Sequence, residues 1–283
     1  MKKLILMVTV IALVLSFAAG TAMAKDDEVT IVYVEWADAV ASSNVVAQVI
    51  EQRLGYKVEL LPVSGAAMWQ ALAVGDVDAM TTASLPVTHG HFIERFGDDV
   101  VNLGPNCEGA GIGLVVPTYV DIDSITELKE HADKFDNQII GIDPGAGIMT
   151  LTEKAFDVYD LGNMELVEGS GATMTLTLKD KIENNEWVVV TGWTPHWKFS
   201  RWDLKYLEDP ENLYGGPVTL NTVVRKGLDE DMPDVFEFLD NFKWDVSEIS
   251  QVMAWNAEGA DPEDSAKRWV EENPEIVNEW LGK

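Results

Sequence analysis

Strand-like runs rich in valine and isoleucine alternate with helix-like segments along most of this 283-residue chain. This alternation is typical of α/β proteins, in which helices cover a mainly parallel sheet. It predicts two α/β lobes, one built from 29–116 together with 225–283 and the other from 117–218. The chain then crosses between the lobes twice, and we expect a ligand cleft between them. The strand-like runs are 30–36, 57–62, 112–117, 138–142, 187–191 and 219–224.

Two of the ten tryptophans stand at the ends of strand-like segments that are far apart in the chain. Trp36 closes the segment 30–36, and Trp193 closes the segment 187–193. Most tryptophans pack in a core, but ligands of open α/β sheets bind at the carboxyl ends of strands. Flat, electron-rich rings at those ends suit a cation whose charge is spread over methyl groups. The pair therefore favours a site for a methylated cation.

The first 24 residues have the pattern of a secretory signal peptide. Lys2 and Lys3 precede an apolar stretch, and Ala22-Met23-Ala24 forms a small-residue cleavage signal. We expect cleavage after Ala24 and export of the mature protein to the periplasm; the alternative is an uncleaved anchor helix. Cys107 is the only cysteine in the chain, so the mature protein has no intrachain disulfide and depends on packing.

The chain is strongly acidic, with 48 acidic against 20 basic residues and a formal net charge of −28. Without Lys2 and Lys3, 18 basic residues remain against 48 acidic ones, which gives −30. Such a field opposes binding to nucleic acid and to anionic membranes. The acidic residues are dispersed among abundant apolar ones, so the composition indicates a folded protein that stays hydrated at high salt.

The turn Asp143-Pro144-Gly145-Ala146-Gly147 follows a strand-like run and precedes a helix-like segment. Glycines allow backbone N–H groups to converge there, and the helix dipole favours an anion. The turn is therefore a candidate carboxylate site, with an ordinary strand–helix turn as the alternative. It is not a P-loop, because no Gly-Lys-Ser/Thr follows.

The histidines do not indicate a metal centre or a hydrolase. His89 follows Leu85-Pro86-Val87-Thr88 and is a candidate hydrogen-bond donor to a carboxylate ligand. No other histidine stands at metal-ligand spacing, so we predict no metal and no cofactor. The chain also lacks a Gly-x-Ser-x-Gly elbow. We therefore predict a protein that is not an enzyme.

Together the motifs resemble the glycine-betaine-binding proteins of bacterial ABC importers, through essentially the whole mature chain. The resemblance implies a two-lobed periplasmic-binding-protein fold, type II-like, with the ligand in the cleft between the lobes. It also implies that Trp36 and Trp193 are walls of an aromatic cage for a quaternary ammonium group. Gly147 and Ile148 would donate backbone N–H groups to the ligand carboxylate, and His89 would add a side-chain donor. The motifs are Tyr-Val-Glu-Trp (33–36), Met-Trp-Gln (68–70), Leu-Pro-Val-Thr-His (85–89), Ile-Asp-Pro-Gly-Ala-Gly-Ile-Met (142–149) and Thr-Gly-Trp-Thr-Pro-His-Trp (191–197).

One position departs from this family. The third cage tryptophan of the family lies five residues before the histidine, where this chain has Ser84. A missing ring removes on the order of 0.5–2 kcal/mol of cation–π attraction and opens space. Either Trp197 or Trp69 replaces it, or the ligand is larger: another betaine, carnitine, choline or a methylated sulfonium.

The prediction is a solute receptor that binds glycine betaine or a related methylated osmolyte and delivers it to an ABC permease. We expect it to act as a monomer. One rival is a receptor of the same fold for an amino acid or a sugar, since tryptophans also stack on sugar rings. A second rival, a secreted hydrolase, lacks a nucleophile and its partners.

Overall fold

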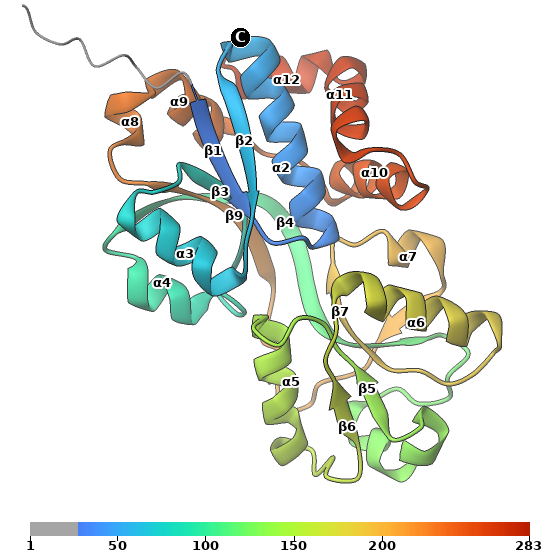
Figure 1. The fold of residues 1–283 in the computed structure, drawn as a ribbon. Coiled ribbons are helices and arrows are strands. Elements are labelled where there is room, and N and C mark those ends of the chain that lie inside the picture. Colours follow the sequence, from blue (N-terminus) through green and yellow to red (C-terminus); the bar gives the residue numbers. More distant parts are fainter. Residues whose placement is uncertain (1–27) are drawn as a thin grey trace, which may run out of the picture.

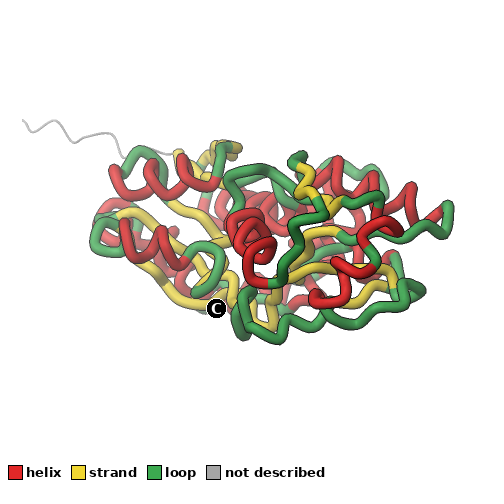
Figure 2. Tube along the Cα trace, turned by 90° about the horizontal axis from the view of Figure 1, so that it is seen from below, coloured by secondary structure: helices red, strands yellow, loops and turns green. Residues whose placement is uncertain are grey.

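The computed structural model describes residues 28–283, and the predicted signal peptide (1–24) lies outside them. The chain forms two α/β lobes, stacked one above the other in Figure 1. Seen from below, helices and strands alternate across the width of the molecule (Figure 2). The predicted two-lobed α/β architecture is confirmed. No helix within 28–283 is long and apolar enough to span a membrane.

The sheet of the first lobe has the strand order β2-β1-β3-β9-β4. β1 pairs in parallel with β2 and β3, whereas β9 runs antiparallel to both of its neighbours, β3 and β4. Buried valines and isoleucines explain why β1, β4 and β9 form strands beneath helices. The strands are β1 (Glu28–Tyr33), β2 (Lys57–Pro62), β3 (Ala79–Leu85), β4 (Val100–Pro117) and β9 (Val218–Arg225).

Helices from both ends of the described chain cover this sheet (Figure 1). The core beneath them is aromatic: Trp269 stacks on Trp280 with ring centroids 5.4 Å apart. The first helix continues as a π-helical turn, Ile50–Leu54, and ends at Gly55, whose φ of 81° suits glycine. The helices are α2 (Ala37–Val49), α3 (Gly65–Val74), α4 (Gly90–Phe96), α8 (Leu228–Asp231), α9 (Pro233–Asn241), α10 (Val246–Ala257), α11 (Pro262–Glu272) and α12 (Pro274–Trp280).

The second lobe has a smaller sheet with its own apolar core. The end of β4 pairs with β7 on one side and β8 on the other, and β5 joins β7 to the edge strand β6. The strands are β5 (Gln138–Ile140), β6 (Glu165–Val167), β7 (Val190–Thr194) and β8 (Leu204–Tyr206). The helices are α5 (Gly147–Val158), α6 (Gly171–Glu183), α7 (Lys198–Arg201) and two 3-10 helices, Ile125–Glu130 and Ala132–Phe135.

Strand β4 belongs to both sheets. Its residues up to Ala110 pair with β9, and from Gly111 onward it pairs with β7 and β8. Only its apolar end, 112–117, reads as a strand in the sequence, because the first half contains Gly104, Pro105 and Gly109. The lobe division (29–116 with 225–283, and 117–218) remains a proposal, and the pairing favours moving its boundaries to near Gly111 and Val218.

One strand differs from the sequence prediction in its position. The run expected at 187–191 forms a strand only from Val190, and β7 continues to Thr194. Trp193 therefore lies inside β7, opposite Ile112 of β4, and not beyond the end of the strand. The reason is its partner: β4 extends far enough to supply hydrogen bonds past residue 191.

Candidate ligand-binding cleft

A small cavity of about 50 Å³ lies between the lobes. This volume is room for about four water molecules, which suits a compact ligand. Both lobes line it: β3 and the segment after it come from the first lobe, and the start of α5 with β7 from the second. Six predicted site residues line the cavity: Trp36, Ser84, His89, Gly147, Ile148 and Trp193.

The two predicted cage tryptophans are held by hydrogen bonds that cross the cleft. Trp36 follows β1, and its Nε1 donates to Asp143 Oδ2 in the second lobe at 3.2 Å. Trp193 in β7 donates its Nε1 to Asp38 Oδ1 in the first lobe at 2.9 Å. Because protein carboxylates accept both indole N–H groups, the rings have only apolar, π-rich surface to offer the cavity.

Behind Trp193 lies a buried cation. The Nζ of Lys198 is 4.3 Å from the centroid of the Trp193 ring. Lys198 is fully buried, and its Nζ has no hydrogen-bond partner among residues 28–283. Burial lowers the pKa of Lys198 to about 7, although Asp38 raises it in part. Burial likewise raises the pKa of Asp38, while the hydrogen bond from Trp193 lowers it.

His89 is a neutral hydrogen-bond donor. It is only 2% exposed, and burial, with a smaller effect of His91, lowers its pKa to about 3. Its Nδ1 accepts the backbone N–H of Ser84 at 3.2 Å, so the proton of the neutral ring is on Nε2. The ring lies 6.2 Å from Trp36, centroid to centroid. Nε2–H is therefore available at the cavity beside an aromatic wall.

The start of α5 brings backbone N–H groups to the cavity. Gly147 and Ile148 are its first two residues, and Ala146 at the N-cap gives no side-chain cap. The first N–H groups of a helix have no acceptor within the helix, and they carry its positive dipole end. The close packing here requires glycine: a Cβ on Gly147 would lie 2.5 Å from the carbonyl oxygen of Thr88 in the first lobe.

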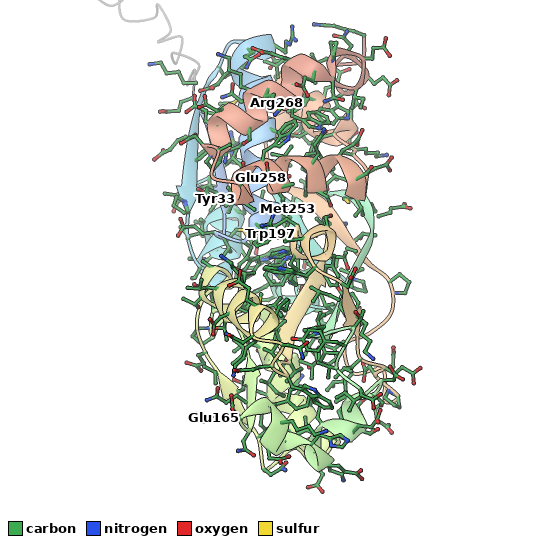
Figure 3. The ribbon with its side chains drawn as sticks, turned by 90° about the vertical axis from the view of Figure 1, so that its right-hand side faces the viewer. Tyr33, Glu165, Trp197, Met253, Glu258 and Arg268 are labelled. Carbon is green, nitrogen blue, oxygen red and sulfur yellow. The ribbon has the colours of Figure 1, made fainter. Side chains whose placement is uncertain are left out.

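The other two predicted site residues, Trp69 and Trp197, do not line this cavity in the described part of the chain. Trp69 is fully buried in α3 and stacks on Phe92 with centroids 5.8 Å apart. Its edge meets His89 at 5.9 Å, so it supports the histidine from behind. Trp197 packs on Trp202 at the start of α7, at the level where the lobes meet (Figure 3).

Two residues at the site, Asp38 and Lys198, were not predicted from the sequence. An acidic residue two positions after Trp36 is a weak signal, and its partner is 155 residues away in the chain. Lys198 directly follows Trp197 and reads as an ordinary surface lysine. As for metals, residues 28–283 contain no group of three or more His, Cys, Asp and Glu side chains that could hold an ion.

Two α/β lobes around a small, ring-lined cavity define a solute-binding protein of the periplasmic type. The chain belongs to the family of substrate-binding domains of ABC-type glycine betaine transport systems, whose model matches residues 27–272. The predicted family is thus confirmed, and with it the prediction of a solute-binding protein and not an enzyme.

Similar proteins share this fold. Lactococcal OpuAC, solved in its closed-liganded conformation with glycine betaine, is 39% identical with a TM-score of 0.85, covering 90% of this chain and 99% of that one. A glycine betaine/L-proline-binding protein from Borrelia burgdorferi is 40% identical with a TM-score of 0.85, covering 89% and 96%. The glycine betaine/carnitine transport binding protein of Listeria monocytogenes is 45% identical over 154 residues, 54% of this chain. That match spans about half (51%) of the Listeria protein.

Proposed function

We propose that this protein is an extracytoplasmic receptor that binds glycine betaine and passes it to an ABC permease. One observation carries the proposal: a single small cavity surface combines two indole rings, a neutral imidazole donor and the start of a helix. Each of these groups matches one part of a methylated zwitterion. The family membership and the likeness to a glycine betaine complex support the same ligand.

The cationic end of the ligand would lie against Trp36 and Trp193. A trimethylammonium group has no N–H donor, so it loses little when it leaves water for ring faces, and the ring quadrupoles attract it. The carboxylate end would accept the N–H groups of Gly147 and Ile148 and the Nε2–H of His89. Both charged ends of the ligand would then contact groups that stabilise them.

Binding would favour the closed arrangement, because each end of the site is built from both lobes. Trp36 and His89 belong to the first lobe, whereas Trp193, Gly147 and Ile148 belong to the second. A ligand stabilises the state in which it touches both sets of groups. Delivery to a permease, periplasmic location after cleavage at Ala24, and action as a monomer belong to the same proposal.

Ser84 makes choline the second candidate. It lines the cavity with a small side chain, and Trp69 and Trp197 are not among the residues that line this cavity. A choline-binding protein solved with choline shares the fold at a TM-score of 0.84 and 25% identity. Choline has no carboxylate, so it would leave the donors at Gly147 and His89 unused. This difference favours glycine betaine.

Calorimetry against glycine betaine, carnitine, choline, proline, an amino-acid mixture and maltose tests the function. We expect saturable one-to-one binding of glycine betaine and weaker binding of choline. Tight binding of a sugar or amino acid with no response to any methylammonium compound would overturn the proposal.

The substitution Ser84→Trp tests the open position in the cavity. If glycine betaine is the natural ligand, the added ring supplies a missing wall and tightens binding by on the order of 0.5–2 kcal/mol. If a larger ligand is natural, the ring excludes that ligand and leaves glycine betaine binding intact. Ser84→Ala is the control, because it removes the hydroxyl without filling the space.

A further inference from the structure

We propose that Asp38 and Asp143 are positioning residues that orient the two cage tryptophans across the cleft and hold the lobes together. The inference rests on the proposed function for its effect on binding. Each carboxylate accepts an indole N–H from the opposite lobe, at 2.9 Å for Trp193 and 3.2 Å for Trp36. The two bonds are reciprocal, because each lobe supplies one indole donor and one carboxylate acceptor.

The sequence places a donor and an acceptor close together in the first lobe. Trp36 is the N-cap residue of α2, and Asp38 lies in the first turn of the same helix. In the second lobe, Asp143 follows β5 and opens the turn that leads into α5, while Trp193 lies in β7. A rigid movement of one lobe therefore makes or breaks both bonds together.

Asp38 is the stronger of the two acceptors. It is only 4% exposed, and Trp193 supplies its side-chain hydrogen bond in the described chain. A bond from an N–H group to a buried carboxylate is charge-assisted, and a buried carboxylate without its donor is costly. The backbone N–H groups of Asp38 and Ala39 also stabilise this carboxylate, and in the closed molecule Trp193 adds a donor from the opposite lobe.

These two hydrogen bonds also fix the orientation of the indole rings. An indole turns about two side-chain bonds, so packing on one lobe alone leaves its plane adjustable. A hydrogen bond at Nε1 fixes that plane. The rings therefore reach their final orientation only when the lobes close, and the cage and the closure form together. Asp143 also ties Trp36 to the turn that positions Gly147.

A double-mutant cycle on Asp38 and Trp193 tests this role, with glycine betaine as the probe. Trp193→Phe keeps an aromatic face but removes the N–H, and Asp38→Ala removes the acceptor. We expect Asp38→Ala to weaken binding about tenfold, as the loss of one hydrogen bond to a charged group does. In the Trp193→Phe background, Asp38→Ala should have almost no further effect. Equal losses in both backgrounds would overturn the proposal.

Three further variants separate positioning from folding. Asp38→Asn retains an oxygen that accepts the indole N–H, and we expect it to bind within about threefold of the parent, since a neutral acceptor is weaker. Asp143→Ala and Trp36→Phe should repeat the cycle on the other bond. Asp240→Ala, an exposed acid on α9, is the matched control and should leave binding unchanged. An Asp38→Asn variant as weak as Asp38→Ala would contradict a hydrogen-bonding role.

Small-angle scattering without ligand tests the role of Asp38 and Asp143 separately from the proposed function. If no methylammonium compound binds the parent protein, the proposed function fails, but the bonds across the cleft can still be tested. The double variant Asp38→Ala/Asp143→Ala should then have a larger radius of gyration than the parent and Asp240→Ala. Identical scattering curves for all three proteins would overturn the proposal.

Discussion

At the scale of single residues, the site is built by groups that constrain one another across the lobes. Trp193 has Asp38 at its N–H, Lys198 against its ring and the edge of His196 at 4.7 Å. Trp36 has Asp143 at its N–H and His89 beside its ring. Each tryptophan is thus fixed by its polar edge and by these neighbours, and only the part of its surface that lines the cavity is left for a ligand.

Replacing either cage tryptophan by alanine should weaken glycine betaine binding. We expect Trp36→Ala and Trp193→Ala to lose about 1–3 kcal/mol of binding free energy, because cation–π attraction and apolar contact are lost together. Calorimetry measures the loss. Trp255→Ala is the control, since this half-buried ring lies on α10 against Arg268. If both cage variants bind every ligand as the parent does, the cage is elsewhere.

Lys198 should make stability depend on pH. Its pKa is about 7 in the folded chain against 10.5 as a free side chain, so the unfolded chain binds more protons between these values. The free energy of unfolding therefore rises as the pH rises from 7 to 10.5, and the cost of burying the charge is fully present below pH 7. Lys198→Met removes that cost.

We expect the Lys198→Met variant to be about 1–4 kcal/mol more stable than the parent at pH 6.5. The difference should shrink toward pH 10, as urea unfolding at a series of pH values would measure. Lys154→Met, an exposed position on α5, should give no such difference. Parallel pH profiles for parent and Lys198→Met would show that the lysine is not buried as a charge.

At the scale of elements, the start of α5 meets the segment that joins β3 to α4. Gly147 faces the backbone of Thr88 so closely that no side chain fits between them. The contact joins the two lobes beside the cavity, so the fit of these two elements limits how far the cleft closes. The two elements are far apart in the sequence, and only the fold brings them together.

The substitution Gly147→Ala should therefore impair closure without unfolding either lobe. Its Cβ would lie 2.5 Å from the Thr88 carbonyl oxygen and 2.8 Å from Thr88 Cα, both backbone atoms that cannot rotate away. We expect at least a tenfold loss of glycine betaine affinity, about 1.4 kcal/mol, with an unchanged melting temperature. Gly145→Ala, two residues earlier, has no atom within 4 Å of the new Cβ and is the matched control. Equal affinities for the two variants would contradict the steric argument.

The sequence predicts a helix or strand correctly where the residues of that element alone carry its pattern. The runs expected at 30–36, 57–62 and 219–224 overlap β1, β2 and β9, because each holds enough apolar residues close together to read as a strand. The first half of β4 carries glycines and a proline, and only pairing with β9 makes it a strand. Asp38 and Lys198 act through partners in other segments, and only packing shows that Trp69 and Trp197 do not line this cavity. Local patterns cannot distinguish these cases.

At the scale of the whole molecule, acidic residues outnumber basic ones in both lobes, and the mature chain expected from the sequence has a net charge of −30. Self-repulsion of this size opposes a compact state, and dissolved salt screens it. The ligand proposed here is a zwitterion with no net charge. Salt should therefore act on the fold and leave recognition of the ligand almost untouched.

We expect the melting temperature to rise between 0.1 and 0.5 M sodium chloride, by about 2–4 °C for each kcal/mol of repulsion that salt relieves. Differential scanning calorimetry measures the rise, and potassium chloride at the same ionic strength should give the same shift. The glycine betaine affinity should stay within about twofold over this range, because a neutral ligand gains little from the protein's field. A melting temperature that falls with salt would contradict the argument.

The position of β9 also sets an order of events during folding. This strand lies between β3 and β4 in the first sheet, yet it is made more than 100 residues after them. The sheet of the first lobe therefore remains incomplete, with two unjoined parts, until residue 225 is available. The second lobe is continuous between Gly111 and Pro217 and can assemble earlier from its own contacts. If the chain is exported unfolded, as the proposed signal peptide implies, this delay keeps its larger lobe from forming before most of the chain is made.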